Sequence, residues 1–169
     1  MMIKKTLITL ITCLFLTTNS LAAGSGGDGG DSGGTSKVKS DYDKAVSFIK
    51  VAKKQEEKGK IEKAKKRYQK AQKLLLKSNI KEPKKADTLN YLGFTTRKLG
   101  DFETAEKYYL EGLALKPNHI GINEYLGELY VATNRHNLAV ERLEVLKSCS
   151  CEEYDELKSI IAGEKVSKY

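Results

Sequence analysis

A 34-residue interval relates the middle of the chain to the part that follows it. The pairs that share this offset are Tyr91 and Tyr125, Leu92 and Leu126, Gly93 and Gly127, Ala105 and Ala139, and Tyr109 and Leu143. Self-similarity at a fixed period of about 20–50 residues is typical of stacked repeats, each of which is one supersecondary unit. The interval therefore predicts a repeat architecture.

Each copy of the interval reads as two antiparallel helices. Gly100 and Asp101 are typical of a turn followed by an N-cap, and the segment "FETAEKYYLEGLAL" that follows has its apolar residues at helical spacing. Pro117 comes where the second helix should end. Small residues such as Gly93 and Ala105 should let the two helix backbones approach closely.

A weaker copy lies upstream, but at a longer interval. It contains Phe48, Ala64, Tyr68 and Ala71, and Ala64 precedes Ala105 by 41 residues rather than 34. Seven extra residues must lie between these two copies. We expect them either to lengthen the second helix of the first pair or to form a loop within 77–88, where Pro83 favours a break.

The middle copy resembles the tetratricopeptide repeat family. The residues that match its pattern are Leu89, Leu92, Gly93, Ala105, Tyr109 and Pro117, and the third copy matches at Leu126, Gly127, Tyr130, Ala139 and Leu143. The departures are Thr96 and Asn123, and in the first copy Ala52 and Gln55. The resemblance implies an all-α fold, a short right-handed solenoid of about three helix-turn-helix repeats within residues 40–163, with a concave groove that binds a peptide or helix of another protein.

A last helix should close the stack. Ser150 and Glu153 have the spacing of a capping box, and Gly163 suits a helix stop. An apolar stripe lies between them, at Tyr154, Leu157, Ile160 and Ile161. Such a capping helix is needed because the last pair would otherwise present its apolar face to water. Residues 164–169 are then a short C-terminal tail.

The N-terminal segment indicates export. Residues 1–22 combine two lysines, a short apolar run and small residues at the end, which is typical of a secretory signal peptide. Residues 23–39 read as a flexible linker rich in glycine and serine. We therefore expect an exported protein, in the bacterial periplasm, with no transmembrane segment in the mature chain.

Helical spacing selects the residues that should face the groove. They are Lys50 and Lys53 in the first pair, Asn90, Phe94 and Arg97 in the second, and Glu124, Tyr125 and Glu128 in the third. We predict a groove that runs from basic to acidic, and we place function on Asn90, Phe94 and Arg97, which the packing pattern does not require. A clamp for a partner's terminal carboxylate is not expected, because Glu124 and Glu128 occupy that surface. The alternative for each residue is a solvated helix face.

Charge is distributed unevenly along the chain. Residues 37–85 contain 18 basic and 6 acidic residues, whereas residues 86–169 contain 10 basic and 14 acidic residues. The basic part reads first as a solvated lysine-rich face and second as a surface that docks on anionic envelope material. Nucleic acid is disfavoured, because its readers usually add exposed aromatic residues or arginines.

Little in the sequence suggests catalysis. Cys149 and Cys151 are consistent with a structural disulfide, with an intermolecular link or free pair, or with a redox-active thiol pair. His119 and His136 fall at helix starts, where turn roles suffice, so no metal or other cofactor is expected. We interpret the chain as a non-enzymatic, protein-binding scaffold or adaptor of the cell envelope, with electrostatic docking or thiol-disulfide exchange as alternatives.

Overall fold

The computed structural model describes residues 39–166, which form seven α-helices and no strand. The helices are α1 (Asp41–Glu57), α2 (Ile61–Lys81), α3 (Ala86–Lys98), α4 (Phe102–Leu115), α5 (Ile120–Ala132), α6 (His136–Leu146) and α7 (Glu152–Ile161). The predicted signal peptide, residues 1–22, and nearly all of the predicted linker, residues 23–39, lie outside the described residues.

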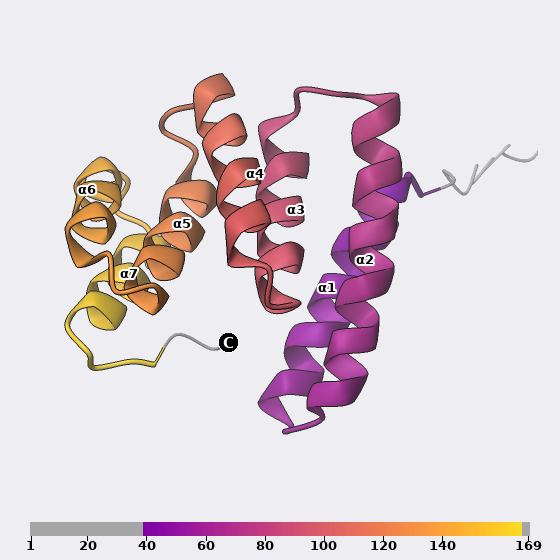
Figure 1. Ribbon diagram of the computed structural model, residues 1–169, viewed down its shortest axis with the longest axis horizontal. Helices are drawn as coiled ribbons and strands as arrows, with labels where there is room; N and C mark the ends of the chain where they lie inside the picture. The colour runs from indigo at the N-terminus through magenta and orange to yellow at the C-terminus, as the bar shows by residue number, and fades with distance from the viewer. Residues whose placement is uncertain (1–38, 167–169) are drawn as a thin grey trace, which may run out of the picture. The chain divides into compact units, whose positions relative to one another are not determined.

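The helices are arranged as three successive hairpins followed by a single helix (Figure 1). Helices α1 and α2, α3 and α4, and α5 and α6 pack as pairs, and contacts between α2 and α3 and between α4 and α5 join each pair to the next. Helix α7 packs against both α5 and α6. The predicted all-α solenoid of helix-turn-helix pairs with a terminal helix is therefore confirmed.

Each hairpin turns through one residue with a left-handed backbone. These residues are Gly59 (φ 68°), Gly100 (φ 95°) and Asn134 (φ 59°), and they are spaced by 41 and 34 residues, as the repeats are. Glycine tolerates positive φ because it lacks a Cβ atom, and asparagine is among the few other residues that visit this region. The turn is thus conserved in geometry across all three copies even where the sequence changes from glycine to asparagine.

The seven extra residues between the first two copies lengthen helix α2. Lys81, the last residue of α2, lies 17 positions after Ala64, whereas Leu115, the last residue of α4, lies 10 positions after Ala105. The connection that follows has the same length in both cases, residues 82–85 and 116–119. Of the two predicted locations for the seven extra residues, helix α2 is therefore the correct one, and it is about two turns longer than α4.

Gly93 and Gly127, the repeated glycines, lie where a neighbouring helix packs closely. A Cβ atom on Gly93 of α3 would lie 2.6 Å from Cδ1 of the buried Tyr109 ring in α4. A Cβ atom on Gly127 of α5 would lie 2.5 Å from Cδ2 of Leu157 in α7. Neither distance leaves room for a side chain, so each of these glycines lets a side chain of another helix pack directly against the backbone, Tyr109 of α4 on Gly93 and Leu157 of α7 on Gly127.

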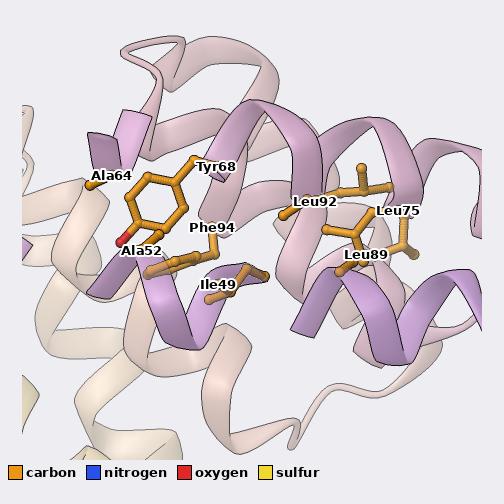
Figure 2. Packing of buried hydrophobic residues seen from close by; sticks show 10 residues of the cluster. Ile49, Ala52, Ala64, Tyr68, Leu75, Leu89, Leu92 and Phe94 are labelled. Atoms are coloured by element: carbon orange, nitrogen blue, oxygen red, sulfur yellow. The ribbon is translucent and has the colours of Figure 1, made fainter. Parts of the chain in front are cut away.

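The buried side chains of α1, α2 and α3 form one continuous cluster (Figure 2). The rings of Tyr68 and Phe94 meet edge to face with centroids 5.7 Å apart. Leu75, Leu89 and Leu92, all fully buried, gather where α2 passes over α3. Apolar area removed from water at such contacts supplies most of the favourable free energy of folding.

The predicted start of the last helix is off by one residue. Ser150 is not an N-cap with Glu153 as its partner, because Ser150 has φ 50° and the N-cap position is Cys151, whose backbone is extended and whose side chain makes no capping hydrogen bond. Ser150 stands between two disulfide-bonded cysteines, in a loop that takes the left-handed conformation there. The helix itself, its buried Leu157 and Ile160, and the left-handed Gly163 after its end agree with the prediction.

Candidate functional site: an acidic cleft between alternate helices

A hollow of about 550 Å³, hereafter the cleft, lies among α1, α3, α5 and α7. Six of its lining residues were predicted to face a groove: Lys53, Phe94, Arg97, Glu124, Tyr125 and Glu128. The others are Glu56, Glu57, Lys98, Glu152, Glu153, Glu156 and Ile160. The cleft is therefore built from the first helix of every pair, together with the terminal helix.

Two aromatic rings and a lysine that line the cleft contact one another. The rings of Phe94 and Tyr125 lie 4.9 Å apart between centroids, at 40° to one another. The Lys53 ammonium lies 4.7 Å from the Phe94 centroid and 5.4 Å from that of Tyr125, and it donates a hydrogen bond of 3.1 Å to the Tyr125 hydroxyl. Cation–π attraction and the hydrogen bond thus hold Lys53 of the first repeat against Phe94 of the second and Tyr125 of the third.

The other two basic residues of the cleft join its helices. Arg97 is 3% exposed, donates to the backbone carbonyl of Tyr125 at 3.1 Å and forms an ion pair of 3.2 Å with Glu128. Lys98 forms an ion pair of 2.9 Å with Glu56. Burial lowers the pKa of Lys98, although Glu56 opposes that shift. These pairs connect α3 to α5 and α3 to α1, so both positive charges are already paired with glutamates of the protein.

Glu124 is the most unusual ionisable group of the cleft. Only 9% of its surface is exposed, and burial raises the pKa of its carboxyl to about 8. The neighbouring carboxylates of Glu128 and Glu153 raise that pKa further, whereas the positive charges of Lys53 and Arg97 act in the opposite direction. A carboxyl of this kind holds its proton near neutral pH until a positive charge comes close.

Two predicted groove residues do not line the cleft. Lys50 is an exposed residue of α1, and Asn90 is buried against Gly121, with its Nδ2 atom 3.0 Å from where a Cβ atom on that glycine would lie. The prediction that packing does not require Asn90, Phe94 and Arg97 is wrong. All three are at least nine-tenths buried, because the first helix of a middle repeat is covered by helices on both sides.

The charge of the cleft also differs from the predicted gradient from basic to acidic. Seven glutamates and three basic residues line it, and α1, the expected basic end, supplies Glu56 and Glu57 beside Lys53. The glutamates that sequence reasoning missed follow Lys53 by three and four positions or lie on α7. The first two share a helix face with Lys53, so helical spacing could have found them. The α7 glutamates depend on how that helix docks.

Cys149 and Cys151 are joined by a disulfide within the loop between α6 and α7, with their Cα atoms 5.2 Å apart. Of the predicted alternatives, the structure therefore has the intramolecular bond. Within residues 39–166, no group of three or more histidine, cysteine, aspartate or glutamate residues is placed to hold a metal ion. In the same range, no helix combines the length and apolar character needed to cross a membrane.

Comparison with known proteins agrees with this geometry. A family model described as a tetratricopeptide repeat matches residues 86–119, which comprise α3, α4 and the connection to α5. The type III secretion translocator chaperone SycD of Yersinia enterocolitica has a similar structure, with a TM-score of 0.52 and 17% identity over 81% of this chain and 93% of SycD. The fold is a tetratricopeptide-like solenoid.

Two further solved structures resemble the chain more loosely. The first TPR of Spaghetti (RPAP3), bound to an HSP90 peptide, has a TM-score of 0.46 and 20% identity over 77% of this chain and 99% of that domain. The OM64 TPR domain of Arabidopsis has a TM-score of 0.47 and 12% identity over 74% of this chain and 99% of that domain. The search of curated proteins finds no match to the chain.

Proposed function

We propose that this tetratricopeptide-like protein is a non-enzymatic adaptor of the cell envelope, which binds a polypeptide segment of a partner protein in the cleft. The observation that carries the proposal is the composition of the cleft. Phe94, Tyr125 and Ile160 supply aromatic and apolar atoms to its lining, and polar and charged side chains from four helices supply the rest. A concave site with a small apolar centre and several fixed polar groups is typical of ligand-binding sites.

The first test of this proposal is direct. Selection of phage-displayed random peptides on the immobilised protein should recover binders, and a selected peptide added to ¹⁵N-labelled protein should shift backbone amide resonances at the cleft-lining positions of α1, α3, α5 and α7. A selection that enriches no peptide over uncoated support would contradict the proposal. Chemical-shift changes restricted to α4 and α6 would also contradict the proposal, because those helices contribute no residue to the cleft.

The lysine-rich face of α2 gives this test an internal comparison. Residues Lys63, Lys66, Arg67, Lys70 and Lys73 surround a second hollow of about 570 Å³ on that helix. Shifts confined to these positions would favour the electrostatic alternative, in which the basic first repeat docks on anionic envelope material. That alternative also predicts binding that weakens steeply with salt, since the lysines are solvated.

Export is the part of the proposal that the N-terminal sequence supports. When the full-length chain is produced in a bacterial host, the periplasmic fraction should contain a protein with the mass of a chain that begins at Ala23 or Gly24. The apolar run and the small residues before that point have the form of a cleaved signal peptide. Intact mass spectrometry of the fractions measures this. A protein that keeps Met1 and stays in the cytoplasm would refute export.

A further inference from the structure

The positive charges inside the cleft already have partners, whereas several of its negative charges do not. Lys53 contacts Tyr125 and Phe94, and Arg97 and Lys98 are paired with glutamates of α5 and α1. Among the described residues, four of the seven cleft glutamates make no hydrogen bond or ion pair through their side chains: Glu57, Glu124, Glu152 and Glu153. The cleft therefore has uncompensated negative charge at Glu57, Glu152 and Glu153, and an unpaired, buried carboxyl at Glu124.

Glu124 is the one among these four that is buried. Its side chain lines the cleft, is 91% shielded from solvent and has no ion-pair or hydrogen-bond partner within residues 39–166. An ionised carboxylate in such a place is costly unless it is paired. Because Glu128 and Glu153 lie close enough to raise its pKa further, the surroundings of Glu124 favour a positive charge and disfavour a second anion.

We propose that the segment bound in the cleft is basic, and that one of its lysine or arginine side chains enters the cleft to pair with the Glu124 carboxylate. Glu152 and Glu153 of α7 lie at the same cleft and attract the basic residues that flank the inserted one. This inference rests on the proposed function and adds the chemistry of the partner. It commits to a polypeptide because Tyr125, which is partly exposed and follows Glu124 in the sequence, lines the cleft and offers apolar surface for a side chain next to the cation.

A metal ion does not fit this surface. Within the described residues no set of three or more candidate ligands converges at the cleft or elsewhere, although hard cations such as Ca²⁺ take about six to eight oxygen ligands. An anionic partner, including a terminal carboxylate or a phosphorylated segment, would meet the unpaired glutamates and be repelled. The geometry thus selects among ligands by the sign of their charge.

The composition of selected peptides tests the inference separately from the proposed function. Peptides enriched on the wild-type protein should contain lysine and arginine more often than the unselected library, and aspartate and glutamate less often. Peptides that bind at the cleft without basic enrichment would overturn the inference while leaving the proposed function intact. Failure to select any peptide would overturn both.

Substitution of Glu124 then tests the assigned contact. For a selected basic peptide, fluorescence anisotropy should show an affinity at least about tenfold lower for Glu124→Gln than for the wild-type protein, because a buried charge pair is lost. The control Glu111→Gln removes an exposed glutamate of α4 that is outside the cleft and should leave the affinity unchanged. Equal affinities for wild type and Glu124→Gln would overturn the contact.

A second variant covers the outer glutamates and guards against misfolding. The double change Glu152→Gln and Glu153→Gln alters surface residues that make no ion pair, and it should lower the affinity severalfold and weaken its dependence on salt. Spermidine is included as a competitor. If spermidine displaces the peptide at equal concentration, the cleft recognises a polyamine and the assignment of a polypeptide is wrong.

Discussion

Replacing Phe94 with alanine is expected to lower the free energy of unfolding by about 3–5 kcal/mol, the range typical of a buried phenylalanine. Phe94 is 4% exposed, and its ring packs against Tyr68 of α2 and Tyr125 of α5. The Lys53 ammonium also lies over it. Removal of the ring would therefore open a cavity at the point where all three repeats meet.

Urea denaturation followed by circular dichroism measures this loss. Phe48→Ala is a matched control, because Phe48 is a partly buried residue at the edge of the same cluster and its removal should cost less. If Phe94→Ala lost no more stability than Phe48→Ala, the central position of Phe94 would be contradicted. The large expected loss also means that truncating Phe94 cannot serve as a clean test of partner binding.

The burial of Phe94 shows what helical spacing resolves and what it leaves open. Spacing places Asn90, Phe94 and Arg97 on one face of α3, and two of them do line the cleft. It does not show how deep that face lies. In the middle of a solenoid, α3 contacts α1, α2, α4 and α5, so a residue can touch the cleft with its edge while the rest of its side chain is in the core.

Local chemistry explains what the sequence predicted well. The turn at Gly100 was predicted because glycine tolerates a left-handed backbone, and the close helix approaches because Gly93 and Gly127 lack a Cβ atom. These signals depend only on the residue itself and its near neighbours in sequence. The number of pairs and the longer first interval followed instead from comparing the chain with itself, through matches such as Ala64, Ala105 and Ala139.

The acidic side of the cleft was not predictable in this way. Glu152, Glu153 and Glu156 reach the cleft because α7 docks on α5, where Leu157 fills the space above Gly127. Sequence reasoning identified α7 and its apolar stripe, but that stripe faces both α5 and α6, and the crossing angle decides which polar residues border the cleft. Tertiary packing, rather than any local pattern, therefore sets the charge of the site.

The stability of the protein should fall as pH rises, and Glu124 should account for a large part of that fall. Its pKa is about 8 in the folded protein, against an ordinary value of 4.5 for glutamate. Between these two values the unfolded chain has lost the proton that the folded protein still holds, so the unfolded state binds fewer protons and each rise in pH favours unfolding. Above about pH 8 both states are ionised and the effect levels off.

The comparison of wild type with Glu124→Gln isolates this contribution, because the two proteins differ only in this one carboxyl group. Glutamine has no charge to bury, so the stability of Glu124→Gln relative to wild type should rise by a few kcal/mol, of the order of 3, between acidic and alkaline pH. Urea unfolding at several pH values from 5 to 9 spans the folded pKa. The Glu111→Gln variant, which changes an exposed glutamate outside the cleft, serves as the control for the loss of one surface carboxylate. A flat difference between Glu124→Gln and wild type would mean that the Glu124 carboxyl is ionised and already compensated within the folded cleft. Glu124 would then not need a cation from a bound segment, and the inference of a basic partner would lose its support.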